Sequence, residues 1–155
     1  MREKRQGRII NITSVGGKIY TPLGAWYHAS KHAVEGFSDC LRLETAAFGL
    51  SVIVIEPGPI RTPWVDIAKS TAEEGSGTGP YAEMTGRVNK TVSKMYSGNS
   101  ISGPEAVAKT IVRAIQSSKP KTRYSSGKMA GMLLIMRHWL SDRVFDRLVK
   151  RIYGF

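Results

Sequence analysis

Two aliphatic runs with one long helical stretch between them constrain the fold of this chain more than any other feature. The first run, residues 8–13, contains three isoleucines, and the second, residues 50–55, ends in Val-Ile-Val-Ile. Nearly continuous aliphatic residues are typical of strands that are covered on both faces, as in a parallel sheet. A strand, a helix and a second strand in this order predict a βαβ unit with a right-handed crossover. The predicted fold class is therefore α/β, with a parallel sheet and flanking helices.

The stretch from residue 25 to residue 48 has the apolar spacing of an amphipathic helix, and Gly49 follows it as a C-cap. We predict that its buried face carries the apolar residues of this spacing, namely Ala29, Ala33, Val34, Phe37, Leu41 and Ala47. Small residues would also let another helix approach closely, at Ala29, Ser30, Ala33 and Gly36.

Shorter segments flank this unit. Residues 1–6 are predicted to form the end of a helix, residues 104–117 a helix with proline in its first turn, and residues 122–127 a short strand. We expect residues 1–155 to form one domain, because a chain of this length fits one.

Two longer segments have distinctive compositions. Residues 63–103 are rich in Gly, Ser, Thr and charge and are predicted to hold one weak helix, over about 81–95. Residues 129–155 alternate apolar and basic side chains, which is typical of an amphipathic helix. Such a helix most often closes a core or forms a subunit contact. Binding to a membrane surface is the less favoured interpretation.

Candidate site residues follow both strands at the edge of the sheet where α/β proteins bind ligands. Ser14 comes after the first strand, and Pro57-Gly58-Pro59 ends the second. Tyr27 and Lys31 are four residues apart, so on a helix they project from one face about one turn apart. A cation near a phenol favours the phenolate, which suits a tyrosine to proton exchange near neutral pH. Ser14 could hold a carbonyl or alcohol oxygen beside the Tyr27 hydroxyl.

Each of these motifs also has a simpler interpretation. Tyr-x-x-x-Lys recurs by chance on solvated helix faces, Ser14 can merely bond its own turn, and Pro-Gly-Pro can be a plain turn. Their combination is more specific. Gly7–Ser14, then Tyr27-His28-Ala29-Ser30-Lys31, then Val52–Thr62 together resemble the short-chain dehydrogenase/reductase family, sharply over residues 7–64.

This resemblance implies a Rossmann-like fold and an NAD(P)-dependent oxidoreductase that interconverts an alcohol and a carbonyl, with NAD or NADP left open. It implies that Ser14, Tyr27 and Lys31 are catalytic and that Ser14 also binds the substrate. The residues that it implies for cofactor binding are Tyr27, Lys31, Pro57, Gly58, Ile60 and Thr62. It further implies a substrate lid over residues 63–103 and a homo-oligomer formed through the 25–48 helix. In the lid, Tyr81, Met84, Met95 and Tyr96 could line a substrate pocket or form the buried side of a small helix.

Some motifs of the family do not occur in this chain. The Gly-rich Thr-Gly-x-x-x-Gly-x-Gly turn that holds the pyrophosphate and the Asn-Asn-Ala-Gly segment have no counterpart. We therefore expect a partial Rossmann-like sheet whose N-terminal strands are missing, with an exposed edge that invites pairing. The alternative function is a truncated, catalytically inactive fragment that acts at most as an interaction or oligomerisation module.

The composition bears on partners and location. Lys and Arg number 23 against 12 acidic residues, a formal net charge of +11, which favours anionic partners. The charges are scattered, and no zinc-ligand spacing or aromatic-rich nucleic-acid motif accompanies them, so we expect no metal and no specific nucleic-acid partner. The single cysteine, Cys40, excludes an internal disulfide, and the polar start lacks a signal-peptide core, so a cytoplasmic location is expected.

Overall fold

The computed structural model describes residues 1–98 and 101–155. Its centre is a parallel three-stranded sheet in the order β1-β2-β3. The strands are β1 (Gly7–Ile12), β2 (Leu50–Pro57) and β3 (Arg123–Ser126). Ile9 pairs with Val52 across the first ladder, and Val54 pairs with Arg123 across the second. The predicted α/β class with a parallel sheet is confirmed.

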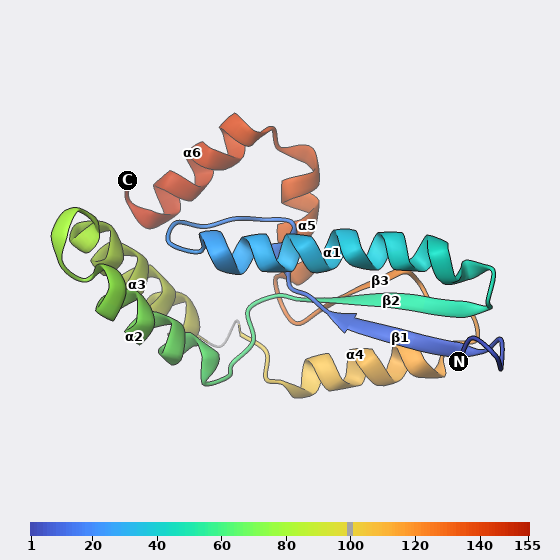
Figure 1. Cartoon of the computed structure of the whole chain (residues 1–155). Coiled ribbons are helices and arrows are strands. Elements are labelled where there is room, and N and C mark those ends of the chain that lie inside the picture. Colours follow the sequence, from blue (N-terminus) through green and yellow to red (C-terminus); the bar gives the residue numbers. More distant parts are fainter. Residues whose placement is uncertain (99–100) are drawn as a thin grey trace.

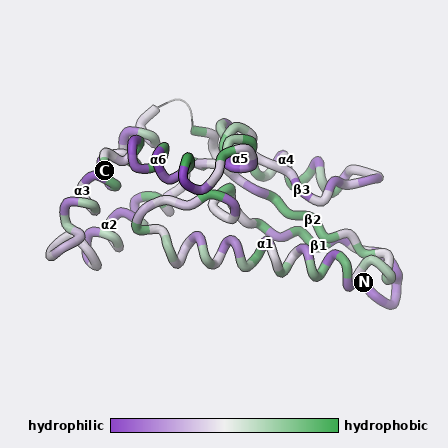
Figure 2. The backbone as a smooth tube through the Cα atoms, turned by 90° about the horizontal axis from the view of Figure 1, so that it is seen from above, coloured by the Kyte–Doolittle hydropathy of each residue, from purple (hydrophilic) through white to green (hydrophobic). Residues whose placement is uncertain are grey.

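Two helices cover opposite faces of the sheet, α1 (Ala25–Ala46) on one and α4 (Glu105–Gln116) on the other (Figure 1). The apolar core lies between the sheet and α4, where Ile53, Ile55 and Ala114 are at most 1% exposed. The remaining apolar residues packed on this core are half-buried: Ile10, Val107, Ile111 and Tyr124. Figure 2 shows hydrophobic colouring along parts of β2, whereas the helices alternate in colour.

The face of α1 that packs on the sheet is polar, so the predicted apolar stripe is wrong. The helix buries His28, Glu35 and Ser38. Of the predicted stripe, Ala29, Ala33, Phe37 and Ala47 are exposed, while Val34 and Leu41 are half-buried. The reason is that the facing strands carry polar side chains, and buried polar groups are tolerated when they are hydrogen-bonded. Asn11 of β1 donates to Ser38 Oγ at 2.9 Å.

Residues 63–103 hold two helices rather than the one weak helix predicted. They are α2 (Trp64–Ser76) and α3 (Ala82–Ser97), joined by a 3₁₀ turn, η2 (Gly79–Tyr81). The pair packs together beyond the carboxyl end of the sheet (Figure 1). Tyr81 is 59% exposed, and Met84, Met95 and Tyr96 are half-buried. The predicted lid range also includes residues 99–100, which lie outside the described residues.

The C-terminal region forms two helices where one was predicted, α5 (Ala130–Trp139) and α6 (Asp142–Tyr153). Between them, Ser141 has an extended backbone at the N-cap of α6. Phe145 and Tyr153 are buried, which fixes one side of α6 to the rest of the molecule. No helix in the described part of the chain combines the length and hydropathy needed to cross a membrane.

The predicted helix end at residues 1–6 is a series of turns instead. The C-cap prediction at Gly49 is close to the observed end of α1, since the helix stops at Ala46 and Gly49 takes a φ of +69°. A glycine suits this turn because left-handed φ values are strained for other residues.

Candidate active site

Ser14 lies at the carboxyl end of β1, where the chain turns into the 3₁₀ helix η1 (Val15–Gly17). Its backbone is extended and its side chain caps η1, accepting the N–H of Gly16 at 3.0 Å. The same hydroxyl donates to the carbonyl oxygen of Pro57 at 3.4 Å. Ser14 thus links the ends of β1 and β2 and is 9% exposed.

Tyr27 lies in the first turn of α1 and comes close to the same short turn. A Cβ added at Gly16 would be 2.8 Å from Cε1 of Tyr27, so the ring lies directly against that glycine. On another side, the ring is 5.0 Å from the ring of Trp64, centroid to centroid. Gly16 therefore contacts both Ser14 and Tyr27, and the turn brings these two predicted residues together.

Lys31 follows Tyr27 by one turn of α1 and reaches back to the sheet. Its Nζ donates to the carbonyl oxygen of Ile12 at 3.4 Å. An ammonium group has three N–H donors. Among the residues that the structure describes, this is the one hydrogen bond of the group, so donors remain for a ligand. The cation lies at the carboxyl end of β1, the end from which the chain continues to Ser14.

The segment from Pro57 to Thr62 leaves β2 and crosses the same edge of the sheet. Gly58 donates its N–H to the Ser126 carbonyl at 2.9 Å, and an added Cβ there would be 3.1 Å from the backbone nitrogen of Ala130. Ile60 forms a parallel bridge with Ser102. Pro57 and Gly58 are buried, Ile60 is half-buried and Thr62 is exposed.

This edge of the sheet leaves polar groups available to a ligand. The Lys31 ammonium has unused donors, and Thr62 is exposed. Gly58 lets the backbone pass close to α5 without a side chain in the way. Within residues 1–98 and 101–155, no group of three or more His, Cys, Asp or Glu side chains could hold a metal ion.

The sequence interpretation missed a buried charged cluster behind the site, on the α1 side of the sheet. Glu35 accepts from Thr13 Oγ1 at 2.6 Å, and Lys18 and Arg123 lie at 3.1 and 3.0 Å from its other oxygen. Glu56 is 4% exposed, and burial followed by the nearby Glu35 charge raises its pKa. No local signal identifies this cluster, because its members come from both flanks of the η1 turn and from α1, β2 and β3.

His28 was also missed, although it stands next to Tyr27 in the sequence. Its Nδ1 lies 2.9 Å from the Gly16 carbonyl oxygen, and its Nε2 lies 3.1 Å from the Thr21 nitrogen. The ring is 8% exposed, and burial lowers the pKa of His28. A histidine beside the tyrosine of a Tyr-x-x-x-Lys pair was the available signal.

The loop between Ser14 and Tyr27 is also held from outside, by the C-terminal helices. Tyr20 donates its hydroxyl to Asp146 of α6 at 2.8 Å, and its ring meets that of Phe145 at 4.9 Å. The Arg137 guanidinium lies over both rings. Residues far apart in the sequence thus fix the position of this loop.

The family model and two relatives that match this chain are named as dehydrogenases, reductases or oxidoreductases. The family model described as short chain dehydrogenase matches residues 1–73. The chain is 36% identical over 146 residues to the "NADPH-dependent 3-dehydrocapnine reductase" of Ornithobacterium rhinotracheale, covering 94% of this chain and 50% of that protein. It is 34% identical over 145 residues to the "Uncharacterized oxidoreductase YbbO" of Escherichia coli K12, covering 94% and 49%.

A solved structure agrees with these relatives. The crystal structure of a short-chain dehydrogenase from Streptomyces avermitilis superposes with a TM-score of 0.66 at 29% identity. The match covers 97% of this chain and 51% of that one. The chain spans about half the length of the relatives it matches, which fits the expectation of a partial sheet.

Proposed function

The chain belongs to the short-chain dehydrogenase/reductase family, and from this premise we propose that it carries the proton-transfer site of an NAD(P)-dependent enzyme interconverting an alcohol and a carbonyl. The observation that carries the proposal is the meeting of Ser14 and Tyr27 around Gly16, with Lys31 one turn away. These three groups lie at the sheet edge where α/β proteins bind ligands.

Each side chain has a distinct role in this proposal. The Tyr27 hydroxyl exchanges a proton with the substrate oxygen, as donor in reduction and acceptor in oxidation. Ser14, held in place by the Gly16 N–H, turns its hydroxyl from the long 3.4 Å contact with Pro57 towards the substrate oxygen and polarises it. Lys31 places a positive charge beside the phenolic group and donates to the ribose hydroxyls of the cofactor.

The cofactor residues proposed are Tyr27, Lys31, Pro57, Gly58, Ile60 and Thr62. The nicotinamide, when bound, supplies or accepts the hydride, and the protein supplies position and electrostatics. Thr62 offers an exposed hydroxyl to the carboxamide, and the Pro57–Ile60 backbone forms the wall of its site. One relative is named as NADPH-dependent, which supports NADP, while NAD stays open.

The wider assignments follow from the same family. We propose one domain over residues 1–155, the 63–103 segment as the substrate lid, and the 129–155 region as its neighbour over the loop at Tyr20. The small-molecule alcohol or carbonyl is the partner of the site, and a second copy of the chain is the partner of α1. A cytoplasmic location is part of this proposal.

The first test is a fluorescence titration of the 155-residue chain with NADPH and with NADH. Trp64 lies 5.0 Å from the Tyr27 ring, so its emission should fall in a saturable way as the cofactor binds. A Trp64→Phe variant should lose most of this signal. Absence of saturable binding would support the alternative of an inactive interaction module.

The second test separates chemistry from binding. Tyr27→Phe should lower turnover of a carbonyl substrate by at least about 100-fold, the usual contribution of general acid/base catalysis, while cofactor affinity changes little. Tyr124→Phe, at a half-buried tyrosine that packs on the core and whose hydroxyl accepts from the Lys121 backbone N–H, is the matched control and should retain activity. Turnover by Tyr27→Phe at the level of the parent chain would contradict the role given to Tyr27.

A further inference from the structure

His28 joins the start of the loop that separates Ser14 from Tyr27 to the middle of that loop. One ring nitrogen contacts the Gly16 carbonyl oxygen at 2.9 Å, and the other contacts the Thr21 backbone nitrogen at 3.1 Å. Thr21 Oγ1 is 3.0 Å from that second nitrogen. The imidazole therefore spans from the turn that Ser14 caps to Thr21, four residues before the start of α1 at Ala25.

These contacts define which nitrogen of His28 carries the proton. A backbone N–H can only donate, so Nε2 must accept from Thr21 and has no hydrogen of its own. The Gly16 carbonyl can only accept, so Nδ1 carries the hydrogen and donates to it. Both contacts are satisfied only by the neutral ring, because a protonated ring would turn a second N–H against the Thr21 N–H.

Two glycines make room for the ring at the two ends of the loop. A Cβ added at Gly16 would lie 3.2 Å from Nδ1, and one added at Gly24 would lie 2.7 Å from Cδ2. Between them, Leu23 has a φ of +61°, a left-handed conformation that is unfavourable for a leucine. Such a conformation persists when surrounding contacts enforce it, and the His28 contact with Thr21, two residues before Leu23, is one such contact.

We propose that His28 is a positioning residue: its neutral ring fixes the loop of residues 14–24 and so sets the Ser14 hydroxyl against the Tyr27 hydroxyl, and protonation of the ring releases the loop. The catalytic consequence rests on the proposed function; the loop geometry does not.

The surroundings of the ring favour its neutral form. Burial lowers the pKa of His28 and is the largest effect, and the neighbouring His32, whose Nδ1 contacts the His28 carbonyl at 2.9 Å, acts in the same direction. The backbone contacts with Gly16 and Ile19 raise the pKa of His28, but the net shift is downwards. Tyr27 presents its ring edge-on at 5.3 Å, and Tyr153 of α6 reaches the Thr21 hydroxyl. None of these groups brings a carboxylate to the imidazole. The lowered pKa extends the neutral form of the ring to lower pH than in an ordinary histidine.

The experiment that needs no activity is proton–nitrogen correlation NMR of the 155-residue chain, with the three histidines assigned by His28→Gln, His32→Gln and His138→Gln. We expect the Nδ1–H tautomer for His28 and a midpoint below about 6.5. The Gly16 and Thr21 amide signals should shift with that same midpoint. An Nε2–H tautomer, or amides that ignore the titration of His28, would overturn the proposal.

The second arm measures turnover at several pH values. His28→Ala should lower kcat about 10- to 100-fold with cofactor KM little changed, because misplacement of catalytic groups costs rate rather than binding. His28→Gln, which can still accept from Thr21, should recover part of kcat and lose the fall in rate that accompanies His28 protonation. His138→Ala, at an exposed histidine, is the control.

These two arms keep the two proposals apart. If the parent chain shows no turnover, the proposed function fails, and the NMR titration still decides whether His28 holds the loop. If turnover is present and His28→Ala matches the parent chain at every pH, the positioning role is wrong while the family activity stands.

Discussion

Glu35 shows at the scale of one residue how α1 can bury a polar face. Its carboxylate is 3% exposed and contacts a hydroxyl, an ammonium and a guanidinium. Nη2 of Arg123, which donates to Glu35, also donates to the two oxygens of Asp39, at 2.8 and 2.9 Å. A buried carboxylate is tolerated when its charge is paired and its lone pairs are satisfied, and here both conditions are met.

Substitution of Arg123 should therefore lower the free energy of unfolding far more than substitution of an ordinary surface arginine. We expect Arg123→Gln to lower the free energy of unfolding by about 3 kcal/mol at pH 7, because Glu35 and Glu56 lose a shared cation. Urea unfolding measures the change. Arg147→Gln, on the exposed side of α6, is the control and should stay within about 0.5 kcal/mol. Equal values for the two variants would contradict the importance of this cluster.

The stability lost in Arg123→Gln should also depend on pH in a defined direction. Burial and Glu35 raise the pKa of Glu56, so folding favours its protonated form. Such a group stabilises the fold below its unfolded pKa, and this contribution is lost as the pH rises through the folded pKa. The Arg123 charge opposes this rise, so in Arg123→Gln the ionised form of Glu56 is even less favourable in the folded protein. The deficit of Arg123→Gln should be smaller at pH 5 than at pH 7, and a deficit that grows on acidification would contradict this assignment.

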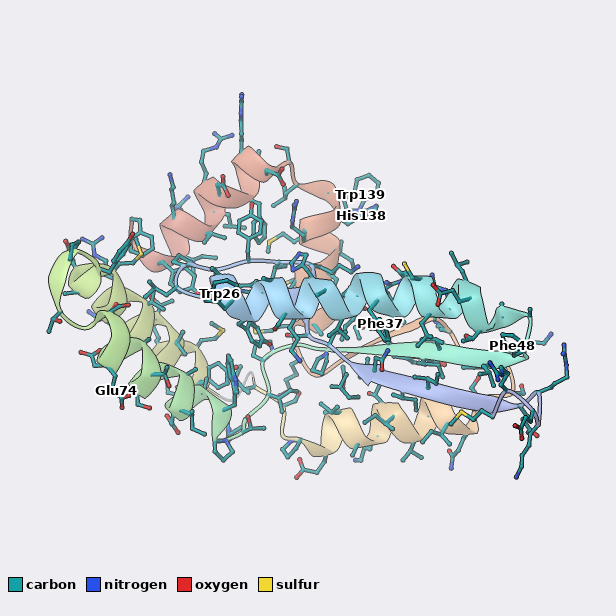
Figure 3. The ribbon with its side chains drawn as sticks, viewed as in Figure 1. Trp26, Phe37, Phe48, Glu74, His138 and Trp139 are labelled. Atoms are coloured by element: carbon teal, nitrogen blue, oxygen red, sulfur yellow. The ribbon has the colours of Figure 1, made fainter. Side chains whose placement is uncertain are left out.

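At the scale of one element, α1 turns its apolar residues outwards. Trp26 is 90% exposed and Phe37 60%, and both are labelled on the helix in Figure 3. A Cβ added at Gly36 would meet no atom within 4 Å, so the space beside it is open. An exposed apolar helix face of this kind suits contact with another protein surface.

We expect this face to mediate self-association, so that Phe37→Glu lowers the mass of the assembly. Size-exclusion chromatography with light scattering reports the change directly. Ile67→Glu on α2 is a matched control, because Ile67 is 62% exposed and lies on another helix. A parent chain that is monomeric, or a Phe37→Glu assembly of unchanged mass, would exclude α1 as the interface.

The sequence predicted those elements that carry a local signal, such as an aliphatic run or a proline at a helix start. The aliphatic runs gave β1 and β2, and Pro104 marked the start of α4. The buried side of α1 was not predictable from hydrophobicity, because Glu35 and Ser38 are buried through partners on other elements. The α2 helix was missed for a similar reason, since Val65 is its one buried residue.

One further feature could have been recognised. Ser141 followed by Asp142 is a helix start signal, and it marks the break between α5 and α6. In the site, the spacing of Tyr27 and Lys31 predicted their shared helix face, and the structure brings Ser14 to the same turn. The roles of these residues stay predictions. The His28 contacts could not be predicted, because they depend on how the 14–24 loop folds back onto α1.

At the scale of the whole molecule, the sheet has an open side along β1. Among the described residues, β1 pairs with β2 alone, and Ile12 is 42% exposed. Thr13 donates to the Ile55 carbonyl, so alternate amides of β1 point towards β2 and the others point to the open edge. An unpaired edge of this kind can pair with another chain.

Hydrogen exchange should reveal this alternation. We expect slow exchange at Asn11 and Thr13 and fast exchange at Ile10 and Ile12, because the latter amides face the edge. The central strand β2 provides the reference for full protection within the same sample. Uniform protection along β1 would instead show that another segment or a second copy covers the edge.

The contacts of Tyr20 with Asp146 and Phe145 of α6 also have a practical consequence for purifying this protein. Asp146 and Phe145 hold the loop between Ser14 and Tyr27, and the chain finishes only a few residues later, at Phe155. Met1 lies at the opposite end of the sheet (Figure 1). An affinity tag is therefore best attached at Met1, where it does not disturb the contacts between α6 and the loop that contains Tyr20.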